Sequence, residues 1–143
     1  MARRSKTDEQ LDFDISFFEK LLKAHPEFVD VLVPLGDAYT RRGFYEKGLA
    51  IDLQLARLRY EDPVTWYNLA CSYSLLNQLD DALIALRRAL ELGYADVDYL
   101  LQDPDLLNLR QSPQYRQFLT AFPSLAAKTA QAARPSAQPE RTN

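Results

Sequence analysis

The 143-residue chain is poor in cysteine, histidine and glycine. One cysteine, Cys71, argues against an internal disulfide framework and suits a reducing compartment such as the cytoplasm. One histidine, His25, provides neither a spaced set of metal ligands nor a catalytic pair, and we interpret it as a structural residue near a helix end. The four glycines form no phosphate-binding loop. We therefore predict a non-enzymatic protein without a metal or any other cofactor.

Long apolar runs are also absent, since no stretch approaches the roughly 20 residues of a membrane-spanning helix. The basic residues Arg3 and Arg4 are followed by polar rather than apolar residues up to Gln10, which is unlike a signal peptide. We expect no membrane partner and a cytoplasmic location.

The composition is that of a globular protein of one domain, with 47% hydrophobic and 26% charged residues. The charge is uneven, because residues 61–122 contain four basic and nine acidic side chains. This acidic half argues against a nucleic-acid partner, although a solvated acidic face or a basic partner would both explain it.

The chain resembles itself when it is shifted by 34 residues, as in a helical repeat. At positions 34 residues apart, large residues match large residues and small residues match small ones. This pattern is typical of helices that approach closely at the small residues and pack the large side chains between them. We expect Trp66 to be buried in this way. The matching pairs are Leu32 and Trp66, Leu35 and Leu69, Gly36 and Ala70, Tyr39 and Tyr73, Gly48 and Ala82, and Leu49 and Leu83.

These positions resemble the tetratricopeptide repeat family. Trp66-x2-Leu69-Ala70-x2-Tyr73 and the later Ala82 follow the family pattern, whereas Asp52 stands where the first unit would have an aromatic residue. The resemblance implies an all-α fold, a right-handed stack of antiparallel helix pairs, in a small bacterial-type protein with a C-terminal closing segment. Such a solenoid serves in protein–protein interaction.

The predicted organisation is one helical domain between two polar ends. We expect a flexible arm at 1–8, a half repeat at 9–26, repeat one at 27–62, repeat two at 63–93 and a closing segment at 94–122. The Ala-, Gln- and Pro-rich tail at 123–143 is expected to be mostly disordered, with a short helix at 124–133.

Several residues predict where helices begin and end. Pro26 ends the first helix, Gly43, Asn77 and Gly93 suit left-handed caps, and Asp62-Pro63 is a helix start. Pro34 lies inside the second helix, so that this helix either begins near Asp30 or bends there. Four aspartates between 96 and 105 suggest calcium, but helix capping explains them better.

The candidate ligand site is the concave groove formed by the first helix of each pair. By helical phase, side chains not needed for packing face this groove, with Tyr67 and Arg41 as the anchors. The predicted groove residues are Asp30, Val33, Asp37, Thr40, Arg41, Val64, Tyr67, Asn68, Cys71, Ser74 and Leu75. The family's clamp for carboxylate tails needs a lysine and an asparagine that the first unit lacks, which argues against that class of ligand.

The leading functional hypothesis is an adaptor that binds a peptide or partner helix in this groove. The alternatives are a self-associating scaffold, for which a homodimer is the simplest form, and a secretion-type chaperone. The aromatic first helix, with Phe13, Phe17, Phe18, Leu21 and Leu22 as its apolar face, and two apolar stripes at 44–60 motivate self-association.

Overall fold

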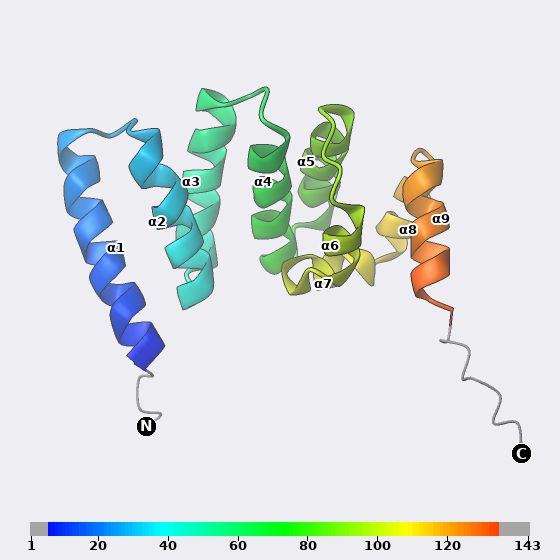
Figure 1. Ribbon diagram of the computed structural model, residues 1–143, viewed down its shortest axis with the longest axis horizontal. Coiled ribbons are helices and arrows are strands. Elements are labelled where there is room, and N and C mark those ends of the chain that lie inside the picture. The colour runs from blue at the N-terminus through cyan, green and yellow to red at the C-terminus, as the bar shows by residue number, and fades with distance from the viewer. Residues whose placement is uncertain (1–5, 135–143) are drawn as a thin grey trace, which may run out of the picture.

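The computed structural model describes residues 6–134, which form a row of antiparallel helices without any strand in that range (Figure 1). The first five helices stand side by side, and the chain then turns into a series of shorter helices. The predicted all-α stack of helix pairs is confirmed. The elements are α1 (Lys6–Ala24), α2 (Val29–Arg42), α3 (Tyr45–Leu58), α4 (Pro63–Leu75), α5 (Leu79–Glu91), α6 (Val97–Gln102), the 3₁₀ helix η1 (Pro104–Leu106), α7 (Leu107–Arg110), α8 (Pro113–Leu119) and α9 (Pro123–Ala132).

The ends of the repeat helices follow from local chemistry. Gly43, Asn77 and Gly93 have φ angles of 88°, 59° and 102°, so each adopts the left-handed conformation that ends the preceding helix. Asp62 caps α4 by accepting a hydrogen bond from the backbone N–H of Val64 at 3.0 Å, and Pro63 occupies the first turn.

Pro34 lies within α2. The helix begins at Val29, next to Asp30, which agrees with the predicted alternative of a helix start near Asp30. A proline ring at this position has no N–H to offer the carbonyl group of Asp30. In the first turn of the helix, the backbone N–H groups of Val31 and Leu32 both donate to the carbonyl of Phe28.

The buried apolar side chains divide into two clusters along the stack. The smaller cluster joins α1 to α2 and includes Leu11, Ile15 and Leu35. The larger one joins part of α3 to α4, α5 and the short helices, with Leu86, Leu100, Leu106 and Leu109 fully buried. A Cβ atom at Gly36 would lie 3.1 Å from the side chain of Ile51, which explains the need for a small residue there.

Trp66, which we expected to be buried, is only partly buried. Its ring lies against the larger cluster, and its Nε1–H donates a hydrogen bond to the carbonyl of Tyr60 at 2.8 Å. The indole thus has one apolar face and one polar edge, a common arrangement for tryptophan near a surface.

Helix α1 is fastened to α2 by two polar contacts beside the apolar ones. The Tyr39 hydroxyl donates to Glu19 at 2.9 Å, and Arg42 Nε donates to Asp12 at 2.8 Å. Burial, together with the Glu19 carboxylate, raises the pKa of Tyr39 to about 12.

The start and the apolar face of α1 differ from the prediction. The helix begins at Lys6, so residues 6–8 are not part of a flexible arm, and residues 1–5 lie outside the described range. Leu11 and Ile15, with Phe18 and Leu22, face α2, whereas Phe13, Phe17 and Leu21 point outward. The buried face therefore lies about a quarter turn from the predicted one.

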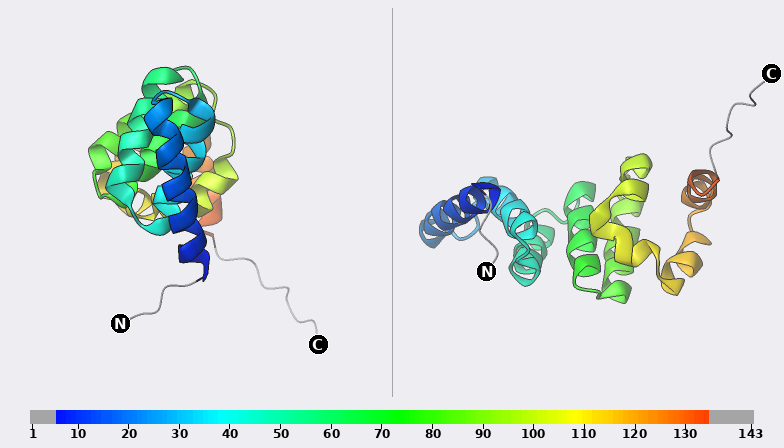
Figure 2. Two further views of the ribbon diagram at one scale, coloured as in Figure 1. Left: turned by 90° about the vertical axis from the view of Figure 1, so that its left-hand side faces the viewer. Right: turned by 90° about the horizontal axis from the view of Figure 1, so that it is seen from below.

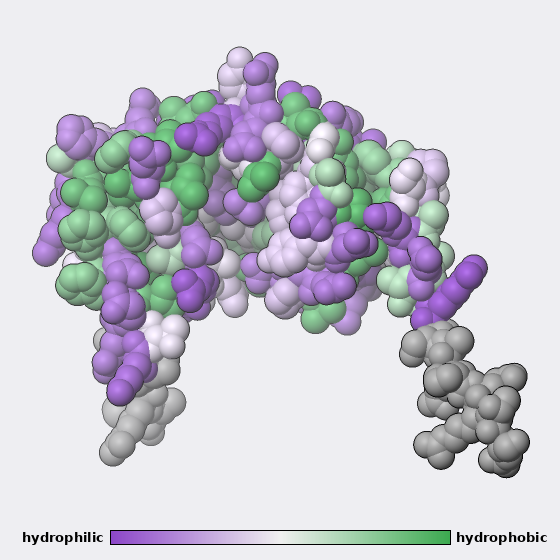
Figure 3. Space-filling model, in the orientation of Figure 1, coloured by the Kyte–Doolittle hydropathy of each residue, from purple (hydrophilic) through white to green (hydrophobic). Residues whose placement is uncertain are grey.

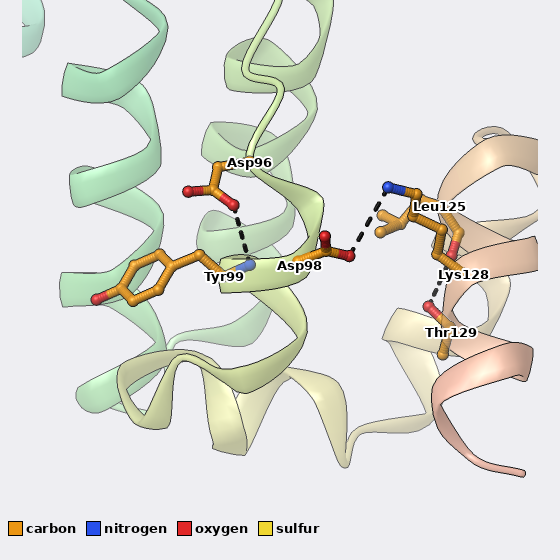
Figure 4. A network of polar contacts seen from close by, with 6 residues as sticks. All are labelled: Asp96, Asp98, Tyr99, Leu125, Lys128 and Thr129. Carbon is orange, nitrogen blue, oxygen red and sulfur yellow. Dashed lines mark hydrogen bonds and ion pairs between the residues drawn. The ribbon is translucent and has the colours of Figure 1, made fainter.

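The expected domain boundary at residue 122 is too early, because α9 packs against α6 and α8. Leu125 of α9 is buried, and Lys128 lies 3.7 Å from the carboxylate of Asp98 on α6 (Figure 4). The helix matches the one predicted at 124–133 within a residue, and the expected disorder beyond residue 134 falls outside the described residues. Asp96 accepts from the N–H of Tyr99 and caps α6, as helix capping predicts.

Replacing Leu86 by alanine should lower the free energy of unfolding by about 2–5 kcal/mol, because it opens a cavity in the larger cluster. Ile84, two residues earlier on the same helix, is 66% exposed, and Ile84→Ala should change it by less than about 0.5 kcal/mol. Urea unfolding followed by circular dichroism measures both values, and equal losses would contradict this assignment of the core.

Candidate functional site

A cavity of about 550 Å³ opens between α2, α3, α4 and the segment formed by α6 and η1. Most of its lining comes from α2 and α4, the first helices of the two repeats. Its walls combine apolar, amide and carboxylate groups. The lining residues are Val33, Pro34, Gly36, Asp37, Thr40, Asp52, Leu55, Arg59, Asp62, Val64, Thr65, Tyr67, Asn68, Cys71, Ser72, Tyr99, Asp103 and Asp105.

The structure brings most of the predicted groove residues together around this cavity. Val33, Asp37, Thr40, Val64, Tyr67, Asn68 and Cys71 line it. The other four, Asp30, Arg41, Ser74 and Leu75, are not part of its lining. Whether the lining residues bind a ligand remains a prediction.

Arg41 lies beside the cavity rather than in it. Its guanidinium is 3.8 Å from the carboxylate of Asp37, one helical turn earlier, and both side chains are more than half exposed. A pair of this kind is worth well under 1 kcal/mol and breaks easily. The predicted role of Arg41 as an anchor therefore finds no support in the geometry of the cavity.

Tyr67 is not an exposed anchor, because the closing segment covers it. Its side chain is 3% exposed and stacks on Tyr94, with ring centroids 4.2 Å apart, and its hydroxyl donates to Asp103 Oδ2 at 2.6 Å. Burial, the neighbouring Cys71 and the Asp103 carboxylate together raise the pKa of Tyr67. The prediction is wrong here because it assumed that the face of α4 stays open.

Ser74 and Cys71 are buried beneath the same segment. The Ser74 hydroxyl accepts from the N–H of Leu109 at 3.2 Å, and Asn108 donates to the Ser74 carbonyl at 3.1 Å. The Cys71 thiol lies 3.6 Å from Asp103, and burial raises its pKa well above the usual value. Such a thiol is protonated and poorly reactive at neutral pH.

Four further carboxylates were missed as groove residues, namely Asp52, Asp62, Asp103 and Asp105. With Asp37 they face the cavity against one basic side chain, Arg59, among the residues that the structure describes. Asp52 had a visible signal, since it replaces an aromatic residue of the repeat. No comparable signal marks the others, because Asp62 and Asp103 also serve as helix caps.

Asp52 is the most unusual of these groups because it is buried inside the stack. Its Oδ2 accepts a hydrogen bond from the hydroxyl of Ser72, which joins α3 to α4. Burial raises the pKa of Asp52 to about 6, while the Ser72 hydrogen bond lowers it and the charge of Asp37 adds to the rise. Burial also raises the pKa of Asp105, aided by Asp103.

Within residues 6–134, no group of three or more His, Cys, Asp or Glu side chains is placed to hold a metal ion. Over the same range, none of the helices combines the length and the apolar character of a membrane span.

The structure consists of stacked helix pairs with a cavity between the first helices of the pairs. This architecture is typical of helical-repeat proteins that serve in protein–protein interaction. Within that class, residues 63–96 match the family described as tetratricopeptide repeat. The match confirms the predicted resemblance over these residues, which form a tetratricopeptide repeat. These repeats are protein–protein interaction modules and are typically non-catalytic.

The chain is also similar to a chloroplastic protein from Arabidopsis thaliana. The two are 45% identical over 62 residues, which is 43% of this chain. The match spans only 18% of the length of the plant protein, so the similarity covers a segment and not the whole of either chain.

Asp52→Asn should stabilise the protein at neutral pH. The pKa of Asp52 in the folded state, about 6, lies above its ordinary value of 3.8, so its ionisation lowers stability as the pH rises from about 4 to 6. The free energy of unfolding of the variant relative to wild type should therefore increase by about 2–3 kcal/mol between pH 4 and pH 7. Urea unfolding at both pH values measures this, and a difference independent of pH would contradict it.

Tyr67→Phe should loosen the closing segment, because it removes a hydrogen bond to the buried carboxylate of Asp103. We expect a loss of about 1–3 kcal/mol in unfolding free energy and faster amide hydrogen exchange in residues 97–106. Tyr99→Phe, at an exposed ring of the same aromatic group, is the matched control. Equal exchange in the two variants would argue against this role of Asp103.

Proposed function

We propose that this protein is an adaptor that binds a basic, extended segment of a partner protein in the cavity between α2 and α4. The observation that carries this proposal is the charge of the cavity, whose lining within the described range has five aspartates and one arginine. A lysine or arginine side chain of the partner would complement these carboxylates. Such complementarity chiefly determines specificity and the rate of association.

The walls of the cavity support the same kind of ligand. Val33 and Val64 stand on the facing helices α2 and α4, and both are about half exposed. The apolar stem of a lysine or arginine can lie between such side chains while its charged group reaches the aspartates. Asn68, also exposed in the cavity, has an amide that can bond to an extended peptide backbone.

The proposal is tested by selecting binders from a random peptide library with the purified full chain. We expect the selected peptides to be enriched in lysine and arginine and to bind more weakly at higher salt. Asp37→Lys should weaken binding of a selected peptide at least tenfold, because it reverses a charge at the mouth of the cavity. Titration calorimetry measures the affinity.

Glu91→Lys is the matched control, because it makes the same change of charge at an exposed position of α5, outside the cavity. It should leave the affinity within about twofold. Peptides without basic residues, or binding that resists Asp37→Lys, would overturn the basic-segment proposal. Circular dichroism of each variant confirms that its fold is retained.

Self-association is the second candidate function, and the outward aromatic side chains of α1 favour it. A concentration-dependent dimer in sedimentation or light scattering would support it, whereas a monomer at hundreds of micromolar would count against it. A cytoplasmic location belongs to the proposal as well, since the buried Cys71 thiol suits a reducing compartment.

A further inference from the structure

Helix α1 has a second apolar face that points away from the stack. Phe13, Phe17 and Leu21 recur every four residues and are 67%, 52% and 36% exposed. The opposite side of the helix packs against α2, so these side chains form a separate surface. Figure 3 shows hydrophobic residues gathered at this end of the molecule. We call Phe13, Phe17 and Leu21 the outer stripe.

The charges along α1 change sign from one end to the other. The half before the middle of the stripe holds Asp8, Glu9, Asp12 and Asp14 with one base, Lys6. The half after it holds Lys20 and Lys23 with one acid, Glu19, whose carboxylate accepts from Tyr39. An identical helix placed alongside in parallel would align like charges, whereas an antiparallel one aligns opposite charges.

We propose that a second copy of this chain binds the outer stripe, with the two α1 helices antiparallel. This inference rests on self-association, the second of the proposed functions. The pairing is isologous, so one twofold axis relates the two copies. The axis passes near Phe17, which brings Phe13 of each copy opposite Leu21 of the other.

The same axis places the acidic first half of each α1 beside the basic second half of its partner. Glu9, Lys20 and Lys23 are all exposed and therefore available for such pairing. A single helix pair buries less than a standard interface of about 1,600 Å², so we expect a dimer that dissociates in the micromolar range. The paired helices lie at the outer end of each stack, away from the acidic cavity (Figure 2).

The first test compares two single variants of the full chain by analytical ultracentrifugation. Phe17→Glu should weaken the dimer at least tenfold, because it places a charge at the centre of the interface and adds to its acidic half. Ile84→Glu makes a similar change at an apolar side chain of similar exposure on α5 and should leave the dimer unchanged. Phe17 is exposed, so this substitution should not unfold the protein.

The second test determines the orientation of the two helices. In a Cys71→Ala background, cysteine is introduced at Gln10 in one sample and at Ala24 in another, both exposed on the outer side of α1. These positions are 14 residues, or about 21 Å, apart along one helix, but the antiparallel dimer brings each close to the other. Disulfides should therefore form in the mixture between unlike chains at least tenfold faster than between like chains.

The outcomes separate the inference from the functions on which it rests. A monomer at all concentrations overturns self-association and the inference together. A dimer that survives Phe17→Glu, or crosslinks that favour like chains, overturns the inference and leaves self-association standing. Peptide binding in the acidic cavity depends on neither result, because its own test uses other residues.

Discussion

The shape of the candidate site depends on the hydrogen bonds of one buried carboxylate, that of Asp103. One oxygen caps η1 by accepting from the N–H of Asp105, and the other accepts from the hydroxyl of Tyr67 on α4. Arg110 donates to the Asp103 carbonyl at 2.7 Å and holds the same turn from the other side. The closing segment thus does more than cover the end of the stack. It also covers part of the concave face and leaves one acidic cavity beside α2.

The polar character of that cavity extends into the interior of the stack. Helix α3 carries the buried apolar residues Leu55 and Ala56, but its buried Asp52 accepts a hydrogen bond from Ser72 of α4. A buried carboxylate with one hydroxyl partner is poorly compensated for its lost hydration, which is why its pKa rises. The buried Asp52 carboxylate between the two repeats therefore lowers the stability of the folded state, and it adjoins the proposed binding site.

Most of the repeat architecture could be predicted from the sequence, because it depends on local and periodic signals. The caps at Gly43, Asn77 and Gly93 and the start at Asp62 follow from backbone chemistry that needs no tertiary contact. The candidate site was predictable only in part. Val33, Asp37 and Val64, which helical phase assigns to the groove, do line the cavity, but the burial of Tyr67 depends on a segment some 30 residues later, whose path no periodicity reveals.

The same limit explains the two faces of α1. Its apolar residues outnumber those that one neighbouring helix can cover, so the sequence alone does not determine which of them turn inward. In the structure Leu11 and Ile15 turn inward, Glu19 and Asp12 bond to α2, and Phe13 and Phe17 are left outside. A helix that keeps aromatic residues on its solvent side tends to aggregate unless a partner covers them. The reversal of charge along α1 favours the proposed antiparallel pairing, because between two copies of this chain that arrangement satisfies the apolar stripe and the charges together.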